Sequence, residues 1–129
     1  MVERVLVDTS AWVDYFRGNE PLRTLVSELI LADAALRCGP VDLELRRGLR
    51  GRQAGQVLRV WYGLELLVTD ELDFASAGDL LRELREAGAS IPSLDALIAS
   101  LAVRHEVQLL ASDRHFDVVP GLLRYPVTA

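Results

Sequence analysis

The sequence has little of what builds disulfides, histidine-rich metal sites or membrane spans. Cys38 is the only cysteine, which excludes an intrachain disulfide and a cysteine-rich zinc site. His105 and His115 are too few and too badly spaced for a histidine-based metal site. No segment approaches the roughly 18 apolar residues of a membrane span, and the N-terminus lacks the basic start and long apolar run of a signal peptide. We therefore expect a cytoplasmic protein without membrane contact.

Lysine is absent, so all 14 basic residues are arginine. Codon usage in a G+C-rich genome is the simplest explanation. The absence nevertheless excludes Schiff-base lysines, the P-loop lysine and a phosphoacceptor receiver mechanism that needs a lysine beside its aspartate. The 19 acidic residues give a formal net charge of -5, which argues against binding nucleic acid through bulk positive charge.

The composition is that of one globular domain over residues 1–129, because half of the residues are hydrophobic and 26% are charged. Short apolar segments alternate with segments of helical periodicity. We expect strands at 4–7, 35–37, 65–68 and 108–111, a further short strand near 123–125, and helices at 9–17, 21–30, 40–50, 54–62, 74–86 and 92–104. This order predicts an α/β domain with a mainly parallel central sheet flanked by helices. We place Trp12 and Phe16 in its core.

Four acidic residues lie at the ends of expected strands or beside apolar helix faces, and not on the polar helix surfaces where most acidic residues of this sequence lie. Asp8 and Asp113 directly follow expected strands, Asp95 opens the most apolar helix, and Glu44 lies beside a buried helical stripe. Each has a simpler interpretation: a helix cap for Asp8, a surface pair with Arg47 for Glu44, a first-turn acid for Asp95 and a turn residue for Asp113.

Taken together, the four acidic residues predict a cation site. The ends of parallel strands and the starts of the following helices lie at one edge of a sheet, which is where ligands bind in such folds. Two carboxylates about 5 Å apart repel by about 3 kcal/mol at an effective dielectric constant near 20. A cluster therefore needs protons or a cation, and a set of oxygen donors suits a hard divalent ion such as Mg²⁺.

Four sequence segments resemble the motifs of PIN-domain ribonucleases, specifically the VapC toxins of toxin–antitoxin pairs. They are Val-Asp-Thr-Ser-Ala-Trp-Val from residue 7, Val-Asp-Leu-Glu-Leu-Arg-Arg-Gly from 41, Ser-Leu-Asp-Ala-Leu-Ile-Ala from 93 and Ser-Asp-Arg-His-Phe from 112. The resemblance extends from residue 5 to about 125. It implies a PIN-like, Rossmann-like three-layer fold and an Mg²⁺-dependent endoribonuclease, with Mn²⁺ as an alternative ion.

The resemblance also implies roles for single residues. Asp8 and Asp95 would bind the metal directly, with Glu44 and Asp113 assisting through water or a second ion. Ser10 would hold metal-bound water, although a helix cap explains it equally well. Ser112 stands where the fourth motif often has threonine and keeps the hydroxyl group. Asp117 could share or replace the role of Asp113, and the sequence leaves this choice open.

Arginines beyond Glu44 could compensate for the net negative charge. We expect Arg17 and the cluster of Arg46, Arg47 and Arg50 to grip RNA phosphates, because guanidinium groups match phosphate oxygens. Ordinary pairing of the cluster with neighbouring acidic residues is an equal alternative. By resemblance, the partners are a VapB-type antitoxin, a second copy of the chain and an RNA substrate, with transfer RNA or ribosomal RNA loops favoured because their bases are accessible.

Two other functions are consistent with the same residues. The first is a PIN nuclease that processes RNA outside a toxin pair. The second is a catalytically silent PIN-like binding module, which the presence of all four acidic residues disfavours. A Ser–His–Asp hydrolase built from Ser112, His115 and Asp117 is a poor candidate, because these residues lie in one turn without a nucleophile elbow.

Overall fold

The computed structural model describes residues 3–127, and its central element is a parallel sheet. Within this range the sheet has four strands in the order β3-β2-β1-β4. They are β1 (Val5–Val7), β2 (Ala35–Cys38), β3 (Glu65–Leu67) and β4 (Gln108–Leu110). β1 pairs with both β2 and β4, and Val7 lies opposite Leu110. The residues that follow β1 and β4 therefore emerge side by side.

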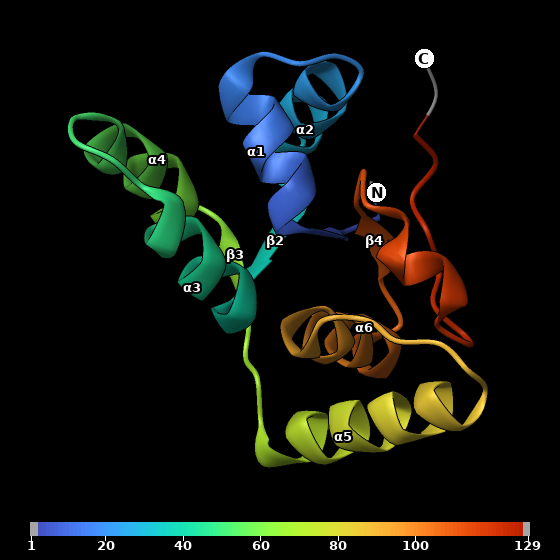
Figure 1. Ribbon diagram of the computed structural model, residues 1–129. Helices are drawn as coiled ribbons and strands as arrows, with labels where there is room; N and C mark the ends of the chain where they lie inside the picture. The colour runs from blue at the N-terminus through green and yellow to red at the C-terminus, as the bar shows by residue number, and fades with distance from the viewer. Residues whose placement is uncertain (1–2, 128–129) are drawn as a thin grey trace.

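Helices cover both faces of this sheet (Figure 1). In the described range they are α1 (Thr9–Arg17), α2 (Leu22–Leu31), α3 (Gly39–Gly48), α4 (Gln53–Tyr62), α5 (Glu71–Glu86), α6 (Ser93–His105) and the short 3₁₀ helix η1 (Arg114–Val118). Figure 1 shows α1 and α2 on one side of the strands and α5 and α6 on the other, with α3 and α4 beside β2 and β3. The predicted α/β architecture with a parallel central sheet is confirmed.

The core follows from the apolar strands and from α6. Val5, Leu6 and Val7 are all fully buried, as expected for a central parallel strand covered on both faces. α6 is buried along most of its length, and α5 packs against it from outside. Trp12 of α1 meets Trp61 of α4 edge to face, with 5.6 Å between the ring centroids. This contact joins two helices that flank the functional edge of the sheet.

Several details differ from the sequence-based expectations. α5 begins at Glu71 rather than Phe74, because Asp70 and Asp73 form a reciprocal capping box there. The strand expected near 123–125 is a single bridge between Leu109 and Arg124. Phe16, expected in the core, has 37% of its surface exposed. Within the described range, no helix combines the length and apolar character needed to cross a membrane.

Candidate metal centre

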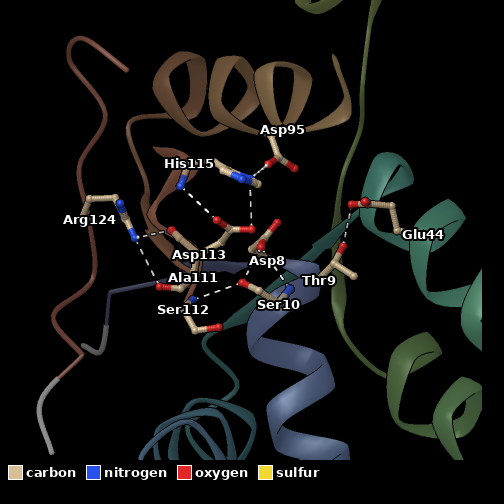
Figure 2. Close-up of polar contacts among 10 residues, drawn as sticks. All are labelled: Asp8, Thr9, Ser10, Glu44, Asp95, Ala111, Ser112, Asp113, His115 and Arg124. Atoms are coloured by element: carbon tan, nitrogen blue, oxygen red, sulfur yellow. Dashed lines mark hydrogen bonds and ion pairs between the residues drawn. The ribbon is translucent and has the colours of Figure 1, made fainter. Parts of the chain in front are cut away.

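Asp8 lies at the junction between β1 and α1, where it caps the helix. Its carboxylate oxygen Oδ2 accepts hydrogen bonds from the Ser10 backbone N–H at 3.0 Å and from the Ser10 hydroxyl at 2.6 Å. The same Ser10 oxygen accepts a bond from the backbone N–H of Ser112 at 3.1 Å (Figure 2). Ser10 therefore links the segment after β1 to the segment after β4. The cap role expected for Asp8 and a site role are compatible, because the cap uses one oxygen only.

The other carboxylate oxygen of Asp8, Oδ1, is buried and has no hydrogen-bond partner among residues 3–127. Asp8 as a whole is only 3% exposed. Burial raises the pKa of Asp8 from 3.8 to about 6; the bonds from Ser10 oppose this rise, and the nearby carboxylates of Asp95 and Glu44 add to it. A buried, unpaired carboxylate oxygen is costly, so this atom suits an electropositive ligand such as a metal ion.

Glu44 and Asp95 approach Asp8 from two different helices. Glu44, in the middle of α3, accepts a hydrogen bond from the Thr9 hydroxyl at 2.8 Å, which orients its carboxylate (Figure 2). Asp95 lies in the first turn of α6 and is 8% exposed. Burial raises the pKa of Asp95, the hydrogen bond from His115 opposes the rise, and the carboxylates of Glu44 and Asp113 add to it.

These three carboxylates form a group that could hold a cation. One oxygen each from Asp8, Glu44 and Asp95 lie within 4.8 Å of one another. The donors are all carboxylate oxygens, which suits a hard divalent ion such as Mg²⁺. Asp8, which has the buried and unpaired Oδ1, is one of these three residues. The type of donor atom and the burial of Asp8 therefore both fit a divalent metal ion.

A second group shares Asp95 and adds Asp113 and His115. The ring nitrogen Nδ1 of His115 lies 3.0 Å from Asp95 Oδ2 and 3.1 Å from Asp113 Oδ2. Asp113 caps η1 by accepting the backbone N–H of His115 at 3.0 Å. The sequence-based prediction gave neither histidine a role in a metal site and did not anticipate that His115 would lie beside Asp95 and Asp113. The available signal was its position two residues after Asp113, where a capped turn brings the two side chains together.

Asp117 belongs to neither group and pairs with an arginine instead. Its carboxylate accepts a bond from Arg124 at 2.6 Å, and Arg124 also donates to the backbone carbonyl oxygens of Ala111 and Asp113 at 3.2 and 3.3 Å. Of the two acidic residues between which the sequence left the choice open, Asp113 is the one placed beside Asp95. Ser112 contributes its backbone N–H to the Ser10 bond, not its hydroxyl.

A cavity of about 210 Å³ opens beside Glu44, between α1, α3 and α4. Its lining is mostly apolar and includes Val13, Phe16, Leu45 and Val57, with Arg17 and Glu44 as its charged residues. Phe16 therefore lines this cavity instead of the core.

The arginines expected to grip RNA are not equally available. Arg46 donates to Asp42 at 3.0 and 3.1 Å and to the Tyr62 hydroxyl, so it makes the surface pairing that was the alternative interpretation. Arg47 and Arg50 are exposed, and Arg17 lines the cavity beside Glu44. Among these four arginines, Arg17 is the one that lines the same cavity as Glu44.

Comparisons with known proteins agree with the motif resemblance. The family model described as PIN domain matches residues 5–122. Ribonuclease VapC11 of Mycobacterium tuberculosis is 36% identical over 121 residues, which cover 89% of this chain and 90% of that protein. Ribonuclease VapC19 of the same organism is 31% identical and is covered to 95%, with 91% of this chain aligned.

Solved structures show the same fold at lower identity. VapBC2 from Rickettsia felis, bound to a DNA fragment from its promoter, matches with a TM-score of 0.77 and 20% identity, covering 94% of this chain and 96% of that one. FitAcB from Neisseria gonorrhoeae matches with a TM-score of 0.74 and 23% identity, covering 95% and 97%.

Proposed function

Since the chain belongs to the PIN-domain family, and within it to the VapC ribonucleases, we propose that it is the toxin of a toxin–antitoxin pair and cleaves RNA with the help of Mg²⁺. One observation carries this proposal: Asp8 directly after β1, Glu44 of α3 and Asp95 of α6 each offer a carboxylate oxygen within 4.8 Å of the others, and Oδ1 of Asp8 is buried and unpaired. Mn²⁺ would serve as an alternative ion, because its preferred donors are the same.

The residues at this site have two different roles. Asp8, Glu44 and Asp95 supply the oxygen donors, while Ser10 and Thr9 fix the orientation of Asp8 and Glu44. A bound divalent ion would lower the pKa of a bound water and offset negative charge on the phosphodiester. Asp113 adds a carboxylate beside Asp95 and His115, where it would assist through water or a second ion.

RNA would reach the carboxylates along the edge of the sheet beyond the ends of β1 and β4. Arg17 is the first candidate for a phosphate contact, because it lines the cavity that also contains Glu44. Arg47 and Arg50 would extend this contact outward, and Arg46 would join only by leaving Asp42. We favour loops of transfer RNA or ribosomal RNA as substrates, because an unpaired loop exposes its phosphates and bases to such a site.

An antitoxin segment would occupy the cavity between α1, α3 and α4. Its apolar lining of Val13, Phe16, Leu45 and Val57 fits the apolar side chains of a peptide, and Glu44 at its border would attract a basic residue. Such a residue would compete with the metal for the carboxylates. We also propose a cytoplasmic setting and a homodimer that binds the antitoxin.

The test is cleavage of total RNA by the wild-type protein and by the Asp8→Asn and Asp95→Asn variants, with Mg²⁺ and with EDTA. Asp79→Asn is the matched control, because Asp79 is an exposed acid on α5. We expect wild type and control to cut RNA only with the metal, and mapping the cut ends would identify the substrate. If either Asp8→Asn or Asp95→Asn cleaved RNA as fast as wild type, the assignment of these residues to the site would be wrong.

The same experiment separates the alternatives. Protein that binds an antitoxin peptide but leaves RNA intact with Mg²⁺ and Mn²⁺ would be a silent binding module. A cleaving protein whose gene has no small antitoxin gene beside it would be a PIN nuclease of RNA processing.

A further inference from the structure

His115 lies between two carboxylates at the outer side of the metal centre (Figure 2). Its Nδ1 is 3.0 Å from Asp95 Oδ2 and 3.1 Å from Asp113 Oδ2. About half of the side chain is exposed to solvent, whereas Asp95 is almost completely buried. A cation arriving from solvent would therefore meet His115 and Asp113 before it met Asp95.

These distances match the spacing of neighbouring ligands on an octahedral ion. With metal–ligand bonds of about 2.1 Å at right angles, adjacent donor atoms lie about 3.0 Å apart. The two distances from His115 fit this spacing, and all three donor atoms lie within 4.8 Å of one another, so one ion could bind all three. A tetrahedral ion of the same bond length would spread them to about 3.4 Å.

The local backbone holds His115 in this position. η1 begins at Arg114, and the His115 N–H donates to Asp113 Oδ1, which leaves Asp113 Oδ2 facing the imidazole. Arg124 fixes the same segment by donating to the carbonyl oxygens of Ala111 and Asp113. The imidazole and the Asp113 carboxylate are therefore arranged before any ion binds.

We propose that His115 is a metal ligand, and that it forms with Asp95 and Asp113 a mixed nitrogen–oxygen site beside the all-carboxylate group. This inference rests on the proposed function, because it assumes that the centre holds divalent ions. The unpaired Oδ1 of Asp8, in the neighbouring group that shares Asp95, independently points to a bound cation. An imidazole ligand favours later first-row transition ions over Mg²⁺, so the second site should prefer such ions more strongly than the all-carboxylate group does.

Co²⁺ is the probe that tests this ligand. In a calorimetric titration without RNA, His115→Gln should lower Co²⁺ affinity about tenfold or more and Mg²⁺ affinity less than about threefold. Glutamine keeps an N–H donor for the carboxylates and lacks the ring nitrogen. Arg114→Ala is the matched control, because it removes an exposed residue from the same turn that is in neither group, and it should behave like wild type.

Proton NMR of the Co²⁺-loaded protein gives a second readout. A ligating imidazole shows a strongly shifted ring N–H resonance, which should be present in wild type and absent in His115→Gln. His105 is an internal reference, because it ends α6 and lies about 15 Å along the helix from Asp95.

Two results would overturn the proposal. If His115→Gln weakened the binding of Co²⁺ and of Mg²⁺ equally, His115 would be a positioning residue. If the affinity for both ions stayed unchanged, His115 would be only an ion-pair partner of the two carboxylates. Both measurements are made without RNA, so their outcome does not depend on the cleavage assay. Failure of the proposed function would be seen separately in that assay, as RNA cleavage by the Asp8→Asn variant.

Discussion

Replacing Asp8 with asparagine should stabilise the metal-free protein at neutral pH while abolishing RNA cleavage. Asp8 is buried, and its pKa is raised from 3.8 to about 6, so at neutral pH the fold holds a charge that the unfolded chain carries more cheaply in water. Each pKa unit corresponds to about 1.4 kcal/mol. The ionised Asp8 side chain therefore lowers the free energy of unfolding by about 3 kcal/mol. A neutral asparagine avoids this cost and can still accept the hydrogen bonds from Ser10.

The sign of the pH dependence follows from the raised pKa. Below pH 3.8 the Asp8 carboxyl is protonated in the folded and the unfolded state, and it costs nothing. As the pH rises towards 6 the unfolded chain releases this proton first, so stability falls, and above pH 6 the full cost is present. The advantage of Asp8→Asn should be about 3 kcal/mol at pH 7.5 and about half of that at pH 5.

Urea denaturation of both proteins in EDTA at these two pH values is the assay. Asp79→Asn is again the control and should show no pH-dependent gain, because its carboxylate is exposed. Excess Mg²⁺ should stabilise wild type and not Asp8→Asn, since a ligand that binds only the folded state adds stability. If the difference in the free energy of unfolding between wild type and Asp8→Asn were the same at pH 5 and at pH 7.5, the reasoning would be refuted.

Three further predictions concern single contacts. Thr9→Val removes the 2.8 Å bond that orients Glu44 and should weaken Mg²⁺ binding several-fold in calorimetry, whereas Thr9→Ser should not. Asp113→Asn should slow RNA cleavage at least about tenfold and Asp117→Asn less than about twofold, because only Asp113 stands beside Asp95; equal effects in the cleavage assay would contradict this. Asp73→Asn breaks the buried ion pair between α5 and α6 and should lower the melting temperature without changing the cleavage rate.

The sequence predicted the fold well because its signals are local. The clearest case is β1, where the apolar segment Val5–Val7 is followed by Asp8, a residue type that caps helices. The strand–helix alternation then allows few arrangements other than a parallel sheet. Asp8 and Asp113 could be placed at one edge from this rule, and the structure does bring the segments after β1 and β4 together through Ser10.

Other features depend on contacts between distant residues, which periodicity does not reveal. Asp73 precedes the helix expected from residue 74, and it is buried against Arg104, 31 residues later, which donates to it at 2.6 Å. This bond from Arg104 lowers the pKa of Asp73. Likewise, nothing in the sequence links Asp117 to Arg124 or His115 to Asp95. These partners are set by how η1 lies against α6 and the segment after β4.

The pairing of β1 with β4 also determines when the centre can exist during synthesis. Asp113 is made more than a hundred residues after Asp8, and Ser10 contacts Ser112 only after β4 has joined β1. At about 5–20 residues per second, the ribosome needs about 5–20 seconds to cover that interval. A nascent chain thus carries all the residues of α1 and α3 without a completed centre, which forms only once β4 has emerged and paired with β1.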